Sequence, residues 1–108
     1  MKHLPYRATT ATGAIIDIRF PLHAETVSAV TVSQLLDSVL RTLSREIGVL
    51  HNVGNGDVLQ ALAMALAVRT GIIYAPFDFV AGETRALLET ALGAVGAAEP
   101  GGPTAGHA

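Results

Sequence analysis

Cysteine is absent from this chain, and tryptophan is absent with it. The lack of cysteine excludes disulfides, thiolate metal sites, iron–sulfur clusters and cysteine nucleophiles. Aromatic residues make up only 5% of the sequence. A folded core must therefore be built mainly from Ala, Val, Leu and Ile, which bury less area per residue than aromatic rings do.

Positive charge is also scarce. Lys2 is the single lysine, the arginines are scattered along the chain, and the formal net charge is -2. Broad binding to nucleic acid or to an anionic membrane relies on clustered Lys and Arg. We therefore expect neither partner.

No apolar run is long enough to predict a membrane span. The longest candidate, residues 57–75, contains Asp57, Gln60 and Arg69, and it falls short of the ~20 apolar residues that a bilayer requires. No apolar run follows Lys2 either, so no signal peptide is predicted. We expect a soluble, cytoplasmic protein.

What the sequence does contain is enough apolar residue for one folded domain. Half of the 108 residues are hydrophobic and 15% are charged, a balance typical of a globular chain. We predict a single domain over residues 1–96. Residues 97–108, AAEPGGPTAGHA, show no periodicity and are rich in Gly and Pro, so they predict a disordered tail.

The N-terminal third predicts a small antiparallel sheet of two to three strands. From Ala14 to Phe20, apolar residues alternate with Asp17 and Arg19, which is the period of two of a half-buried strand. Pro21 is expected to end that strand. Residues 26–30 are rich in β-branched types, and both a third strand and the start of a helix remain open there.

Three helices are predicted after the sheet. The first begins at Thr31 and carries an apolar stripe with polar residues opposite; the second runs from Asp57 to about Thr70; and the third starts between Asp78 and Gly82. Residues 72–75 predict a short strand or an extended crossing. The fold class is therefore α+β, a small antiparallel N-terminal sheet packed with three helices.

The second helix is apolar on nearly every side, with only Gln60, Arg69 and Thr70 interrupting it after Asp57. Such a helix must be covered by its neighbours, by a partner subunit, or by both. We predict that it is central and buried, and that the chain forms a homodimer or a higher oligomer. The interface is expected at this helix, with Leu62, Ala65 and Leu66 as candidates, or at an edge strand.

One loop combines polar side chains, glycines and a helix N-terminus. It is residues 51–57, HNVGNGD, and it lacks the Gly-Lys-Ser/Thr of a phosphate-binding loop. A plain connector and a ligand site are both open interpretations, because free amides and glycines allow a ligand near the backbone. The candidate ligand-binding residues are His51, Asn52, Asn55, Arg69 and Tyr74.

The sequence predicts no catalytic residues, no cofactor and no metal. The four histidines lack metal-ligand spacing, and Ser38 and Ser44 lie outside any nucleophile motif. The function that we expect is a non-catalytic homo-oligomeric interaction or regulatory module, which could have an unidentified protein partner. The alternatives are a small-molecule-binding protein or small enzyme with a pocket at the 51–57 loop, and a ribbon-helix-helix-like DNA-binding dimer.

Overall fold

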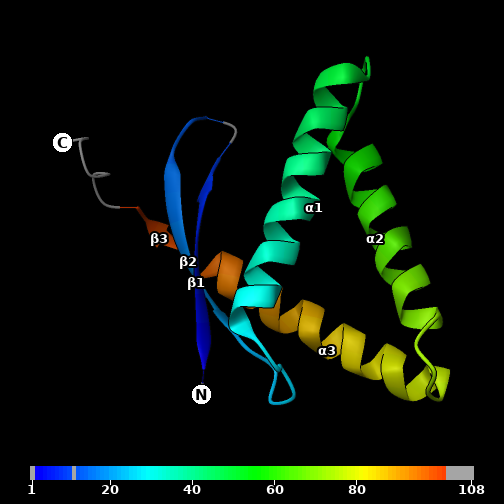
Figure 1. The fold of residues 1–108 in the computed structure, drawn as a ribbon. Helices are drawn as coiled ribbons and strands as arrows, with labels where there is room; N and C mark the ends of the chain where they lie inside the picture. Colours follow the sequence, from blue (N-terminus) through cyan, green and yellow to red (C-terminus); the bar gives the residue numbers. More distant parts are fainter. Residues whose placement is uncertain (1, 11, 102–108) are drawn as a thin grey trace. The chain divides into compact units, whose positions relative to one another are not determined.

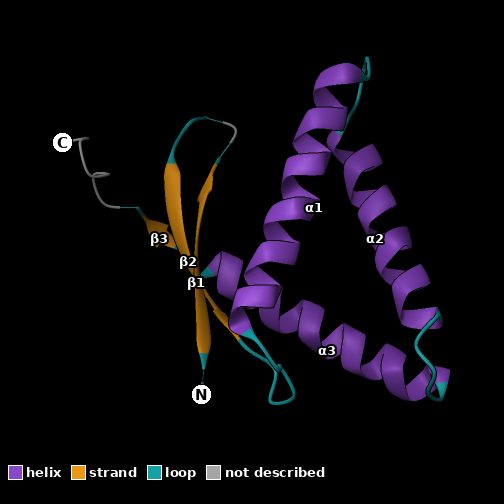
Figure 2. Cartoon of the chain, in the orientation of Figure 1, coloured by secondary structure: helices purple, strands orange, loops and turns teal. Residues whose placement is uncertain are grey.

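The structure is a computed structural model that describes residues 2–10 and 12–101. It contains, in chain order, β1 (His3–Thr9), β2 (Ile15–Pro21), α1 (Ala29–Val49), α2 (Asn55–Gly71), α3 (Phe77–Gly96) and β3 (Glu99–Pro100) (Figures 1 and 2). The three strands form one antiparallel sheet in the order β1-β2-β3. The predicted α+β fold, with an N-terminal sheet and three helices, is confirmed.

The chain divides into two compact units. The first comprises Met1–Ala29 and Ala86–Ala108, and the second is Val30–Arg85. The first unit therefore holds the sheet and the second half of α3. The second unit holds α1 after its first residue, α2 and the first half of α3.

The hairpin of β1 and β2 shows the alternation that the sequence predicts. Tyr6 pairs with Ile18 and Leu4 pairs with Phe20, which places these apolar side chains on one face of the sheet. Leu4 and Ile18 are buried, with 9% and 5% of their surface exposed. The rings of Tyr6 and Phe20 lie 6.4 Å apart between centroids.

The opposite face of the hairpin carries an ion pair. Arg7 and Asp17 are cross-strand partners, and Arg7 Nε donates to Asp17 Oδ1 at 2.7 Å while Nη2 donates to Oδ2 at 3.1 Å. The Arg7 hydrogen bond holds the pKa of the Asp17 carboxyl below its ordinary value. This bidentate pair pins the register of the two strands.

Pro21 is the last residue of β2, as the sequence predicts. It lies opposite His3, and the next amide, Leu22 N–H, still donates to the Lys2 carbonyl at 2.8 Å. In an antiparallel ladder, alternate residues turn their amides to opposite edges. Pro21 therefore faces the edge away from β1, where no hydrogen bond is lost.

The two segments with an open or predicted strand beyond the hairpin form none. Of the two interpretations left open for residues 26–30, the start of a helix is the one observed, since residues 26–28 are a loop and α1 begins at Ala29. Residues 72–75 form a turn rather than a strand or an extended crossing. In both places β-branched residues favour a strand locally, but no strand in residues 2–10 or 12–101 pairs with them.

The third strand comes from the predicted tail. Glu99 pairs with Asp17 and Pro100 with Ile16, and Gly101 N–H donates to the Ile15 carbonyl at 2.7 Å. The sequence gives little sign of it, because a strand of two residues has no periodicity. The rest of the predicted tail, residues 102–108, lies outside the described residues.

The α2 helix begins at Asn55, two residues before the predicted start at Asp57. Gly54 is the N-cap residue, and the Asp57 carboxylate accepts the Gly54 N–H at 3.0 Å from the third helical position. The Gly54 carbonyl in turn accepts the Asp57 N–H at 3.1 Å. This is the reciprocal arrangement of a capping box, with a backbone carbonyl in place of the cap side chain.

The predicted burial of α2 is not confirmed within the chain. Thr70 is its one buried residue, and most of its apolar side chains are exposed. The Thr70 hydroxyl lies 2.8 Å from the Leu66 carbonyl and 3.0 Å from the Thr84 hydroxyl, which links the end of α2 to the first half of α3. No helix in residues 2–10 and 12–101 is long and apolar enough to cross a membrane.

Candidate functional site: an apolar groove between two helices

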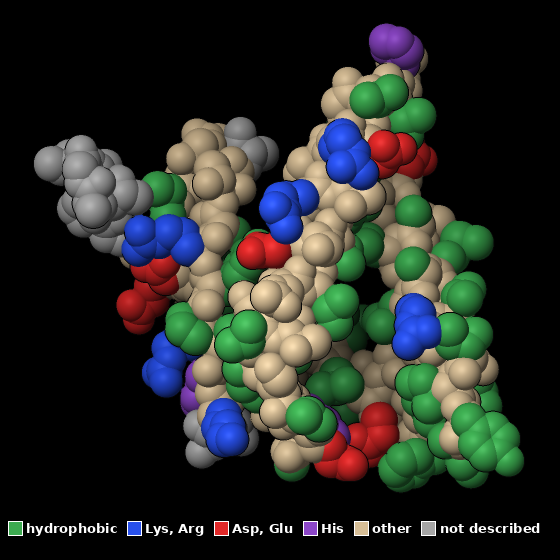
Figure 3. All heavy atoms as spheres, in the orientation of Figure 1, with side chains coloured by type: hydrophobic (Ala, Val, Ile, Leu, Met, Phe, Trp, Pro, Cys, Tyr) green, Lys and Arg blue, Asp and Glu red, His purple; other side chains and the backbone are tan. Residues whose placement is uncertain are grey.

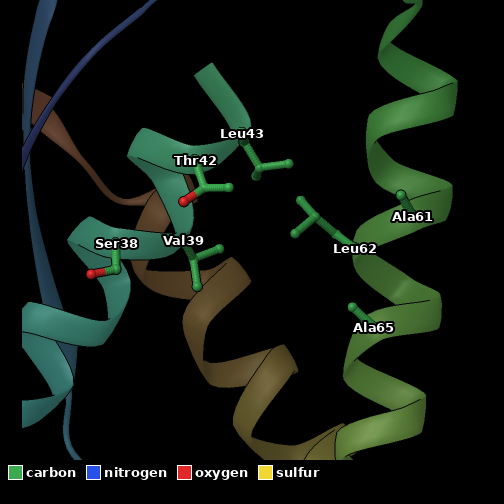
Figure 4. Close-up of a pocket in the computed structure, with 7 residues that line it drawn as sticks. All are labelled: Ser38, Val39, Thr42, Leu43, Ala61, Leu62 and Ala65. Carbon is green, nitrogen blue, oxygen red and sulfur yellow. The ribbon is translucent and has the colours of Figure 1, made fainter. Parts of the chain in front are cut away.

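The most distinctive surface of the second unit is a groove between α1 and α2. It has a volume of about 400 Å³ and is lined from α1 by Ser38, Val39, Thr42 and Leu43, and from α2 by Ala61, Leu62 and Ala65. Leu62 points from α2 towards Leu43 and Val39 of α1 (Figure 4). We call these seven residues the α1–α2 groove.

The α1 wall of the groove comes from the stripe that the sequence shows. Apolar residues recur at helical spacing along α1, so they share one face of the helix. That face is not sealed, since α1 has no buried residue and Val39 keeps 47% of its surface exposed. Leu43 is half-buried, at the centre of the lining.

The α2 wall combines small side chains with one large one. Ala61 and Ala65 are one turn apart and both exposed, while Leu62 between them is half-buried. Alanine at this spacing leaves the backbone open to close approach by another helix. The lining carries no charged residue, and its polar atoms are the hydroxyls of Ser38 and Thr42.

The groove continues into a second hollow at the loop that the sequence singled out. This hollow has a volume of about 310 Å³, shares Leu43 and Ala61 with the groove, and is lined also by His51, Asn52 and other residues, namely Glu46, Ile47, Leu50, Val53, Asp57 and Val58. Asn52 has a positive φ of 59°, a conformation that asparagine tolerates better than most residues. Two of the five predicted ligand-binding residues thus lie at one cavity.

The structure does not bring the other three predicted ligand-binding residues to this cavity. Asn55 begins α2 but does not line the hollow, and Arg69 lies in the last turn of α2. Tyr74 follows that turn and is fully exposed. The loops before and after α2 lie at its opposite ends (Figure 1), so these side chains do not form one pocket with His51.

Of the predicted interface residues, Leu62 and Ala65 line the groove and Leu66 does not. Leu66 lies one turn after Leu62, and its carbonyl accepts the Thr70 hydroxyl. Sequence reasoning did not single out Val39, Leu43 or Ala61 as site residues. The signal that could have found them is the match between the α1 stripe and the uncharged middle of α2.

The lining of the groove offers mainly apolar contact, because five of its seven residues are Val, Leu or Ala. Within the described part of the chain, no three His, Asp or Glu side chains gather in a way that could hold a metal ion. What the lining offers a ligand is shape and hydrophobic surface.

Comparisons with known proteins do not narrow this further. No protein-family model, curated protein or solved structure in the searches matches the chain.

Proposed function

We propose that this protein is a non-catalytic, homo-oligomeric interaction or regulatory module that associates through α1 and α2. The carrying observation is the unsealed α1–α2 groove beside a helix whose apolar residues are largely exposed. Apolar side chains gather over α2 in the face shown in Figure 3. Contiguous apolar surface of this kind marks an interaction site in a soluble domain.

The free edge of β1 is protected against pairing with another strand. This favours the helices, rather than a strand, as the associating surface. Even-numbered residues of β1 bond to β2, as the Leu22 to Lys2 and Thr10 to Ala14 hydrogen bonds show. Pro5 therefore faces the free edge of β1, where it offers no N–H. Proline at this place is a common protection against edge-to-edge pairing.

The test is the mass of the protein in solution, measured by light scattering over a range of concentrations. We expect a dimer or higher oligomer for the natural chain and a monomer for Leu62→Glu and Ala65→Glu, because each places a charge in an apolar interface. The matched control is Ala67→Glu, an exposed alanine on the opposite side of α2. A monomeric natural chain would contradict the proposal, and so would equal effects of Ala65→Glu and Ala67→Glu.

A second candidate function is small-molecule binding, favoured by the hollow at His51 and Asn52. Its apolar walls with a few polar side chains are typical of ligand pockets, although its volume is at the small end of their range. A fragment screen by NMR would test it. Shifts confined to the amides of residues 50–58, and lost in His51→Ala, would support binding there.

The hairpin gives the ribbon-helix-helix alternative no support. That fold pairs one strand of each subunit across the dimer, whereas β2 is already flanked by β1 and β3. Retention on duplex DNA at low salt, lost as salt rises, would be the result that revives it.

A further inference from the structure

We propose that the occupant of the α1–α2 groove is α2 of a second copy, antiparallel to the first α2, with Asp57 of each copy facing Arg69 of the partner subunit. This inference rests on the proposed homo-oligomeric function and adds its geometry. The dimer is two-fold symmetric, and its axis passes the two α2 helices at the level of Ala63, midway between Asp57 and Arg69.

One ridge of α2 carries the argument. Asp57, Ala61, Ala65 and Arg69 follow one another at intervals of four residues, so they form a continuous row along the helix surface. A residue rises about 1.5 Å along a helix, so the two charges stand about 18 Å apart. Between them the ridge is made of alanine alone.

This ridge is self-complementary. A two-fold axis at the level of Ala63 places Asp57 opposite Arg69 of the partner subunit, and Ala61 opposite Ala65 of the partner subunit. The acidic start of one helix then meets the basic end of the other at both ends of the contact, while small side chains meet in the middle. An isologous interface requires this kind of match between a surface and its own copy.

Both charges at the ends of the ridge are available to a partner. Asp57 is exposed and spends one carboxylate oxygen on the Gly54 N–H. The Arg69 side chain is exposed and makes no hydrogen bond or ion pair with residues 2–10 or 12–101. A carboxylate accepts several hydrogen bonds, so Asp57 can keep its cap and still receive Arg69 of the partner subunit.

The same ridge faces the groove, since Ala61 and Ala65 are part of its lining. A partner α2 that lies along this ridge contacts the α1 wall as well, at Val39 and Leu43. By symmetry, α2 of each copy lies in the groove of the other copy, which produces a four-helix arrangement with an apolar centre. The α2 helix of a second copy suits this place because it is apolar around nearly its whole circumference and can contact both walls of the groove. An amphipathic helix has an apolar side for only part of that contact.

The decisive experiment mixes two charge variants, Arg69→Glu and Asp57→Lys. In a homodimer of either variant, like charges face each other at both ends, and we expect the dimer dissociation constant to rise roughly tenfold. In a heterodimer of the two, opposite charges face each other at both ends. Light scattering on the equimolar mixture should therefore return the dimer mass at a concentration where each variant alone is mainly monomeric.

The mixing result separates this inference from the proposed function. A natural dimer whose two variants fail to recover on mixing would overturn the antiparallel α2 pairing while leaving the homo-oligomer in place. A natural chain that is monomeric would overturn both. Circular dichroism of each variant checks that loss of the Asp57 cap has not unfolded α2, and recovery on mixing cannot result from such damage.

A second measurement keeps the inference testable if Asp57→Lys does not fold. The chain has no cysteine, so Ala61→Cys and Ala65→Cys each introduce a single thiol. The antiparallel pairing predicts that an oxidised mixture forms the mixed 61–65 disulfide faster than either variant links to itself, because only that pair lies at one level. Faster self-linking of the separate variants would indicate parallel helices and overturn the inference.

Discussion

The hairpin of β1 and β2 and the pair of helices α1 and α2 differ in how far they bury their apolar side chains. Each hairpin strand alternates apolar and polar residues, and its apolar face is buried at Leu4 and Ile18. The two helices carry more apolar residue than the hairpin, yet α1 has no buried residue and α2 buries only Thr70. The hairpin buries its apolar face within one chain, whereas most apolar side chains of the two helices are not buried.

The contrast shows that apolar content and burial are separate properties. A strand with one apolar face needs one covering layer, while a helix that is apolar all round needs neighbours on every side. A chain of this length has few elements from which to supply them. The exposed apolar surface of α2 is therefore the observation that most strongly supports the proposal of a second copy.

The largest effects are expected from two truncations that test this comparison, Ile18→Ala in the hairpin and Val39→Ala in the groove. Ile18 has 5% of its surface exposed, so we expect its loss to lower the free energy of unfolding by about 2–4 kcal/mol at any protein concentration. Val39→Ala should act mainly on association, so its effect on the melting temperature should shrink as the protein is diluted and the natural chain itself dissociates. Thermal unfolding at several concentrations measures both.

The control for both truncations is Val27→Ala, at a loop side chain that is 99% exposed. It should change stability by less than about 0.5 kcal/mol. A concentration-dependent loss in Ile18→Ala, or a concentration-independent one in Val39→Ala, would contradict the distinction between a closed hairpin and an open groove.

The elements that the sequence predicts well are those with a local pattern. Alternation from Ala14 to Phe20 gives β2 and its buried face, and the helical stripe after Thr31 gives α1. The element that it misses, β3, is held by a register with residues more than eighty positions earlier in the chain. A pairing of two residues at such a distance leaves no periodic trace.

The candidate site was predictable only in part, for a related reason. The apolar middle of α2 marks Leu62 and Ala65, but which side of α2 faces α1 depends on how the two helices are connected, and sequence spacing does not state it. His51 and Tyr74 were grouped because both flank α2, yet a straight helix of this length separates its ends. The length of α2, rather than its composition, therefore keeps His51 and Tyr74 apart.

A second prediction concerns how closely β3 fits against β2. A Cβ added at Gly101 would lie 2.5 Å from Ile15 Cγ2 and 3.1 Å from the Ile15 carbonyl oxygen. Because a β-branched side chain moves little at χ1, Gly101→Ala should displace β3 at a cost of about 1–3 kcal/mol. Hydrogen exchange checks this, since the Gly101 amide that bonds to Ile15 should lose its protection.

The matched control is Gly93→Ala in the last turn of α3, where the added Cβ meets nothing within 4 Å. Alanine is a better helix former than glycine, so this variant should gain about 0.5–1 kcal/mol. The same change would then have opposite signs at two glycines of one unit. Unchanged exchange at residue 101 in Gly101→Ala would show that β3 tolerates the methyl group.

The smallest expected effect concerns the polar face of the hairpin, where Arg7 lowers the pKa of Asp17 below its ordinary value of 3.8, chiefly through its side-chain hydrogen bond. Because the folded-state pKa lies below the unfolded one, the pair stabilises the hairpin above pH 3.8, and this stabilisation is lost as pH falls through the lowered folded-state pKa. An NMR titration of the Asp17 carboxyl should show its pKa rising in Arg7→Ala. Arg19→Ala removes the arginine two residues after Asp17 in β2 while leaving the Arg7 hydrogen bond intact, so it should raise the pKa of Asp17 less. Equal shifts in the two variants would mean that general positive charge, rather than the bidentate contact that pins the register, controls this carboxylate.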